Sequence, residues 1–179
     1  HCDRTSHRLS APPVALVHVT ALAHHLTIVE GGNALSAFRA AALLARIREV
    51  APTVTAVSAR HVHVVSSEEP LDEATAATVA RLLTYGDAYR PPSLEAGQEE
   101  ATIVVAPRLG TVSPWASKAT DIAHSCGVDI HRVERVTEFH LRTSAALDHE
   151  TWHAVAALLH DRMTESVLQS REDARHLFD

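Results

Sequence analysis

The chain has 179 residues and a mass of 19.4 kDa, which is enough for one domain with a buried core. Its hydrophobic content of 46% and charged content of 21% are ordinary for a globular protein and exclude wholesale disorder. Sixteen basic against 22 acidic residues give a formal charge of -6, which disfavours a general nucleic-acid binder. No apolar run reaches the length of about 18 residues that a membrane span needs.

Residues 1–25 are predicted to be a disordered leader. Arg4 and Arg8 precede an apolar stretch over 14–23, which has the loose shape of a secretory signal, but two prolines and a histidine weaken that stretch. The chain has only Cys2 and Cys126, so it can form one disulfide at most and is no disulfide scaffold. A cytoplasmic location is therefore predicted.

From residue 26 onward, hydrophobic periodicity and turn residues predict strands that alternate with helices. In chain order the predicted elements are a strand 26–30 with a turn at 31–33, a helix 34–50, one or two strands over 53–66, a helix 70–84, a loop 86–97, a strand 101–107, a helix 114–125, a strand 130–141 and a long helix from about 148 to 168. This order predicts an α/β (α+β) layered domain with helices packed on a sheet. It also suggests two similar strand-helix halves, 26–86 and 101–168. Residues 169–179 are charged and are predicted to begin a linker.

One local pattern matches a zinc-hydrolase motif. His149-Glu150-Thr151-Trp152-His153 places two histidines at i and i+4 on one helix face, with a glutamate between them that could act as general base. Zinc would need a third protein ligand, and Glu172 is one candidate. However, 14 histidines in the chain make chance matches common, and the pattern falls in the first turn of a helix, where exposed polar residues are normal.

Other candidate groups are weaker. His61 and His63 alternate on a predicted strand, so they share a face and could chelate a metal, although a solvated histidine-rich face is favoured. Cys126 lies near a helix C-terminus, which does not activate a thiol, and is predicted to be a small core residue.

The segment 107–123 differs from these isolated candidates, because it runs from a strand end through a turn into a capped helix. Ser113 and Pro114 predict the helix start, and helix N-termini attract anions. Arg108 lies just before this start, and Lys118, the only lysine of the chain, lies one turn inside it. Either an anion is bound here, or Lys118 forms a local pair with Asp121; the residues alone favour neither reading.

The segment 108–123, followed by His124-Ser125-Cys126-Gly127, closely resembles the signature near the N-terminus of the long, single-chain form of phosphoribosylformylglycinamidine synthase. Further runs resemble the same family in the right order, at 33–39, 82–86, 132–135 and 159–165. The resemblance covers about residues 26–179. Residues 1–25 match nothing in the family, Gly32 replaces a larger residue, and the zinc-like pattern falls where the family has ordinary polar residues.

This resemblance implies the N-terminal domain of a larger enzyme of purine biosynthesis. That enzyme is a glutamine amidotransferase and ligase, which joins formylglycinamide ribonucleotide, ATP and glutamine-derived ammonia to make the amidine. Its ATP, magnesium and substrate sites lie mainly in central synthetase domains, and its glutaminase is C-terminal. The N-terminal domain is similar to a small separate subunit of split versions, which packs on the synthetase core and supports ammonia transfer. The chain alone is therefore expected to hold no cofactor and to be non-catalytic.

The resemblance and the helix start together predict a domain-interface or anion-binding surface. Its members are Arg108, Thr111, Ser113, Trp115, Ser117, Lys118, Thr120 and Asp121. The expected partners are the synthetase and glutaminase domains of the same enzyme, with no nucleic acid and no membrane. Two alternatives remain open: a free-standing accessory subunit that acts in trans, and the small zinc hydrolase.

Overall fold

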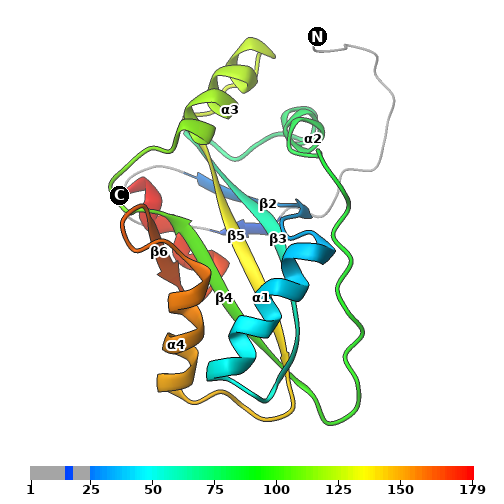
Figure 1. The fold of residues 1–179 in the computed structure, drawn as a ribbon. Coiled ribbons are helices and arrows are strands. Elements are labelled where there is room, and N and C mark those ends of the chain that lie inside the picture. Colours follow the sequence, from blue (N-terminus) through cyan, green and yellow to red (C-terminus); the bar gives the residue numbers. More distant parts are fainter. Residues whose placement is uncertain (1–14, 18–24) are drawn as a thin grey trace.

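A computed structural model describes residues 15–17 and 25–179 of the chain and shows helices packed on one antiparallel sheet (Figure 1). The sheet has six strands in the order β1-β2-β3-β5-β4-β6, and every neighbouring pair is antiparallel. The strands are β1 (Ala15–Val17), β2 (His25–Asn33), β3 (Val54–Ser67), β4 (Glu99–Pro107), β5 (Arg132–Thr143) and β6 (Glu165–Leu168).

Four α-helices and one 3-10 helix connect or follow these strands in the described part of the chain. They are α1 (Ala37–Val50), α2 (Glu73–Leu82), α3 (Pro114–Ser125), α4 (His149–Leu159) and the 3-10 helix η1 (Arg171–Phe178). Each α-helix begins at a serine or aspartate whose side chain accepts a hydrogen bond from the first turn, as the sequence predicts for Ser113 and Asp148. The layered fold of two strand-helix repeats, β2-α1-β3-α2 and β4-α3-β5-α4, is therefore confirmed. No helix among the described residues is long and apolar enough to cross a membrane.

The helices pair across the two repeats and cover one sheet face at its two ends. Alternate side chains of β3 point to this face. Val57 and Ala59 pack in a core cluster with α1 and α4, whereas Val65 packs in another cluster with α2 and α3. Figure 1 shows α1 and α4 in front of the sheet and α2 and α3 at its upper end. Between the two helix pairs, the same face carries His61 and His63.

The opposite face is covered by the C-terminal segment. Ala174 and Leu177 of η1 are buried against a third core cluster, which contains Val62 and Val64 of β3. The predicted linker start at 169–179 is therefore wrong for η1, since its apolar side chains complete this face. The sequence pattern missed it because only eight residues form the helix and most of them are polar.

Ionic contacts hold η1 in place. The Arg171 guanidinium donates to both oxygens of Glu138, at 2.7 Å each, and also to Glu30 at 2.7 Å. His140 lies between Glu138 and Glu100, and Arg142 also donates to Glu100. We call this set the paired cluster; its members are Glu30, Arg60, Glu100, Glu138, His140, Arg142 and Arg171.

The predicted long last helix is also wrong beyond Leu159. Residues 165–168 form β6, which pairs with β4 at the edge of the sheet, and Met163 is 76% exposed. Asp161 accepts a hydrogen bond from the Met163 amide, so a turn replaces the helix here.

Two further expectations fail near the start of the chain. Residues 15–17, within the predicted disordered leader, form β1 and pair with 26–28 of β2. The remaining leader residues, 1–14 and 18–24, lie outside the described part. Gly31 and Gly32 form no turn, because β2 continues through them with a register shift to Asn33. A Cβ on Gly31 would lie 2.5 Å from the His63 ring, and one on Gly32 would lie 2.5 Å from the Asp87 carbonyl oxygen, so both glycines allow close packing.

Candidate functional site

The predicted site begins at the N-terminus of α3, a helix that is capped by one polar side chain and fixed to β5 by another. Ser113 caps the helix by accepting a hydrogen bond from the Ala116 amide at 3.0 Å. One turn further on, the Thr120 hydroxyl accepts from the Val133 amide of β5 at 3.1 Å. β4 pairs with β5 only from Thr137 onward, so on this side of β5 the Thr120 side chain takes the place of a neighbouring strand for the Val133 amide. Ser113 and Thr120 therefore have structural roles within the domain.

Trp115 belongs to a cluster of aromatic and basic side chains at the start of α3. Its ring stacks on His63 with centroids 5.6 Å apart, and the Arg135 guanidinium lies 4.4 Å from the centre of the indole ring. The Tyr85 hydroxyl joins them, because Arg135 donates to it at 3.2 Å and it lies 2.7 Å from the His63 Nε2. Three elements thus converge here: β3, β5 and the segment after α2.

The two histidines of this region are neutral at neutral pH. Burial lowers the pKa of both His61 and His63 to about 4, and the nearby Arg135 charge acts in the same direction. His63 is fully buried, and its Nδ1 lies 3.1 Å from the Val29 carbonyl oxygen. The predicted solvated histidine face is therefore wrong for His63, whose ring lies against Trp115 and Tyr85.

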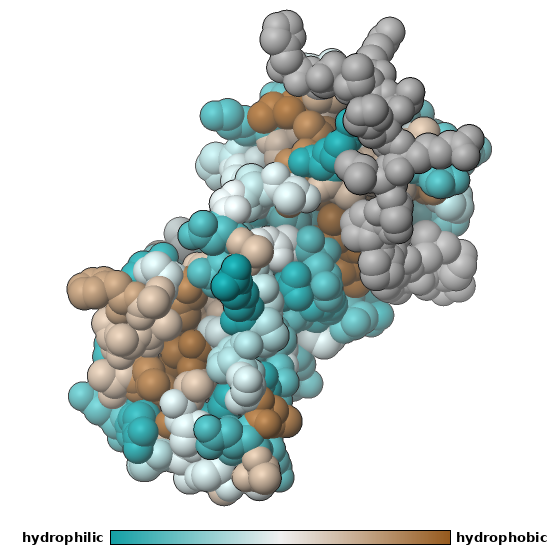
Figure 2. Space-filling view, turned by 90° about the vertical axis from the view of Figure 1, so that its right-hand side faces the viewer, coloured by the Kyte–Doolittle hydropathy of each residue, from teal (hydrophilic) through white to brown (hydrophobic). Residues whose placement is uncertain are grey.

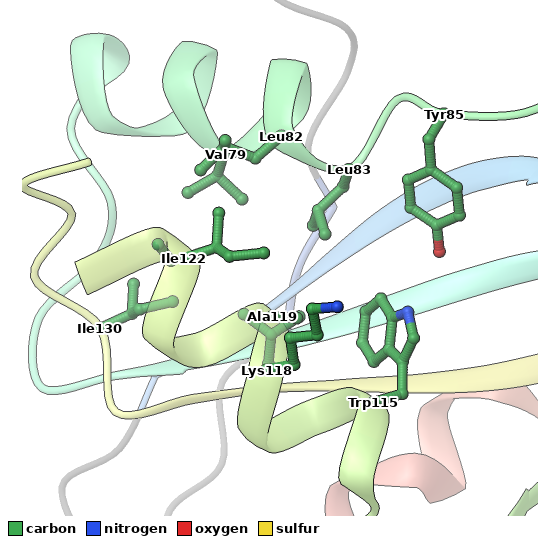
Figure 3. A pocket seen from close by; sticks show the side chains of 11 residues that line it. Val79, Leu82, Leu83, Tyr85, Trp115, Lys118, Ala119, Ile122 and Ile130 are labelled. Atoms are coloured by element: carbon green, nitrogen blue, oxygen red, sulfur yellow. The ribbon is translucent and has the colours of Figure 1, made fainter. Parts of the chain in front are cut away.

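A groove of about 300 Å³ opens between α2 and α3 (Figure 3). We call it the helix groove; it is lined by Val79, Leu82, Leu83, Tyr85, Trp115, Lys118, Ala119, Ile122, Ala123, Ile130 and Val133. Apolar side chains make most of its wall. In Figure 3 the Lys118 side chain extends along the groove toward Trp115 and Tyr85. We call Tyr85, Trp115, Lys118 and Arg135 the cationic rim.

The other predicted site residues lie on the surface and make few contacts. Arg108, Ser117, Lys118 and Asp121 are exposed, and their side chains have no hydrogen bond or ion pair within the described part of the chain. Thr111 donates to the Arg108 carbonyl oxygen at 2.6 Å and so shapes the turn before α3. The local Lys118–Asp121 ion pair, which was one of the two open readings, is not formed.

Site prediction from sequence missed Tyr85, His63, Arg135 and the α2 side of the groove. A signal for some of them was present, since Tyr85 ends the run 82–86 and Arg135 ends the run 132–135, both of which resemble the family. His63 lies in no such run, and its place in the cluster comes from contacts with Tyr85 and Trp115, which are distant in the sequence.

The zinc-like pattern at 149–153 lies on a different helix, α4, and forms no metal site in the described residues. His149 and His153 are exposed on α4, with their Nε2 atoms 3.1 Å apart. Within the described residues, no group of three histidine, cysteine or acidic side chains could hold a metal ion, so the candidate Glu172 does not complete the pair.

The geometry thus shows a small α+β domain in which the start of α3, the cationic rim and the helix groove lie together. The model of the family described as formylglycinamide ribonucleotide amidotransferase N-terminal matches residues 60–178. This match begins within β3 and includes all of α2 and α3, and η1. The chain therefore belongs to the formylglycinamide ribonucleotide amidotransferase N-terminal family, a domain of the synthase that acts in purine biosynthesis.

Proposed function

We propose that this domain docks on the synthetase part of the enzyme through the start of α3, and that docking supports the transfer of glutamine-derived ammonia. The complete enzyme converts formylglycinamide ribonucleotide to the amidine with ATP and glutamine. In this proposal ATP and magnesium are bound by the other domains, and this chain contributes a surface rather than reacting groups.

One observation carries this proposal: polar and charged side chains are exposed on α3 without a use inside the domain. The side chains of Ser113 and Thr120, by contrast, already accept hydrogen bonds within the domain, from the Ala116 amide and the Val133 amide. Ser117, Lys118 and Asp121 make no side-chain contact of that kind within the described residues, although they lie on the same helix. Exposed polar groups that the fold does not need are available to bind a partner domain.

The test is Lys118→Ala in the complete enzyme, compared with Arg46→Ala on the exposed side of α1. We expect the Lys118 variant to lower glutamine-dependent amidine formation about tenfold, a typical cost of about 1.4 kcal/mol for an interface contact. Formation from added ammonia should fall less, because it bypasses transfer between active sites. Arg46→Ala should change neither rate.

The isolated chain provides a second check. Purified on its own, it should make no amidine from formylglycinamide ribonucleotide, ATP and ammonia. Turnover by the isolated chain would contradict the docking role, as would equal rates for Lys118→Ala and wild type in the complete enzyme.

A further inference from the structure

We infer that the helix groove is an anchor site for an apolar side chain of a polypeptide segment that carries carboxylates beside that side chain, supplied by another part of the same enzyme. This inference rests on the proposed docking function and names the chemistry of the contact. It adds a second contact region, beside the exposed polar side of α3.

The floor of the groove selects an apolar occupant. Val79, Leu83 and Ala123 are buried and line it from α2 and α3, and Val133 lines it from the sheet. Of the eleven lining residues, only Tyr85, Trp115 and Lys118 carry polar side-chain atoms, and all three stand at the cationic rim. A charged or amide group on the floor would lose its hydration without a partner. The volume of about 300 Å³ is at the lower limit of small-molecule pockets and suits one or two side chains.

The rim selects negative charge next to the anchor. Lys118 and Arg135 have no ion pair with any described residue, and Arg135 donates only to Tyr85 among the side chains around it. The chain as a whole has a net charge of -6, yet Lys118 lines this groove and Arg135 lies 4.4 Å from the centre of the Trp115 ring at the same rim. Carboxylates on the partner would complement them.

The surroundings of the groove favour a polypeptide over a small molecule. Ile122 is 47% exposed at the mouth, and Tyr85 is also partly exposed. Figure 2 shows that hydrophobic residues gather in two areas toward opposite ends of the visible face, with hydrophilic residues between them. A ligand that filled the groove alone would leave the mouth uncovered, whereas a folded segment would bury the mouth together with the groove.

The experiment places a photo-reactive p-benzoylphenylalanine at residue 122 of the complete enzyme and identifies the cross-linked residues by mass spectrometry. Ile122 is half exposed, so the larger side chain fits without disturbing the core. The matched control carries the same group in place of Phe38, which is 86% exposed on α1. We expect position 122 to cross-link to an apolar residue of the synthetase or glutaminase part, with an Asp or Glu within two positions, and position 38 to give no such product.

The captured segment is then synthesised as a peptide, and its binding to the 179-residue chain is followed by tryptophan fluorescence. Lys118→Glu should weaken this binding about two- to fivefold, the usual range for a rim ion pair. Replacing the carboxylates of the peptide by amides should weaken it similarly, and replacing its apolar anchor by alanine should weaken it more.

Other outcomes overturn the inference. Cross-links to residues 1–24, to a second copy of the chain, or to a segment without carboxylates would each assign a different occupant, and an absence of cross-links would show that the groove is open. If position 38 but not 122 reaches the synthetase part while Lys118→Ala still lowers glutamine-dependent activity, docking holds and only the anchor site fails.

Discussion

Two regions of this domain use charge in opposite ways. In the paired cluster, every basic side chain meets a carboxylate: Arg171 contacts Glu138 and Glu30, and Arg142 contacts Glu100. At the cationic rim, Lys118 and Arg135 meet no carboxylate among the described residues. The first region joins η1 to the sheet, and the second borders an apolar groove.

This difference in charge pairing indicates which charged residues stabilise the fold and which can bind a partner. Charges that are buried and satisfied within the domain hold its parts together, and removing one partner leaves another charge uncompensated. Charges that are exposed and unpaired cost the fold little when they are removed, so their contribution is available for a partner. Variants in the paired cluster should therefore affect unfolding, whereas variants at the rim should affect the complete enzyme.

The largest effect is expected from Glu138→Gln. Burial alone would raise the pKa of Glu138, but hydrogen bonds from Arg171 and His140 lower it to about 2. The ionised carboxylate thus contributes stability that is present above the ordinary value of 4.5 and is lost as the pH falls toward 2. Denaturant unfolding at pH 7 should show a loss of about 3 kcal/mol. Glu30→Gln, the half-exposed partner of Arg171, is the control and should cost less than about 1 kcal/mol; equal costs would break the comparison.

A smaller loss is expected from Thr120→Val. The isosteric change keeps the packing but leaves the buried Val133 amide without its acceptor, which should lower the free energy of unfolding by about 1–3 kcal/mol. Ser117→Ala, three positions earlier on the exposed side of α3, should change it by less than about 0.5 kcal/mol. If the two variants are equally stable, Thr120 is not a structural residue and returns to the candidate docking surface.

Two histidines, His63 beside the cationic rim and His140 in the paired cluster, should respond to pH with opposite sign. The folded-state pKa of His63 lies near 4, below its ordinary 6.5, so the unfolded chain binds a proton that the folded chain does not, and stability falls as the pH drops from 6.5 toward 4. Burial would lower the pKa of His140, but hydrogen bonds to Glu138 and Glu100 raise it, so its contribution is present below 6.5 and is lost as the pH rises through the raised value.

Unfolding measured between pH 8 and 4.5 tests this contrast. His63→Gln should flatten the loss of stability on acidification by up to about 1.4 kcal/mol per pH unit, the limit for one proton. His140→Gln should make the same loss steeper. Changes of equal sign in the two variants would mean that the histidines do not sit in opposite environments.

The smallest effect on stability is expected from Lys118→Ala. Its side chain is exposed and unpaired among the described residues, so the free energy of unfolding should change by less than about 0.5 kcal/mol. Thermal unfolding of the purified chain checks this. A loss above 1.5 kcal/mol would show that Lys118 supports the fold, and a fall in activity of the complete enzyme could then no longer be assigned to docking.

Most helices and strands could be predicted from local patterns, because caps and periodicity act over a few residues. Ser113 and Asp148 start α3 and α4 where the sequence places them. The end of α4 could not be predicted, since apolar spacing continued past Leu159 while the free edge of β4 drew residues 165–168 into the sheet. Pairing with a strand about 60 positions away leaves no periodic signal in those four residues.

For the site, local features of the sequence were enough to identify the capped start of α3, the single lysine beside it and the family to which the chain belongs. Which of these residues serve the fold, and which remain available to a partner, depends on the tertiary structure. It buried Thr120 against Val133, it brought Tyr85, His63 and Arg135 around Trp115, and it opened the helix groove between α2 and α3. The physical reason is that capping depends on neighbours in the chain, whereas burial and charge pairing depend on segments that meet only when the sheet and its two helix pairs assemble.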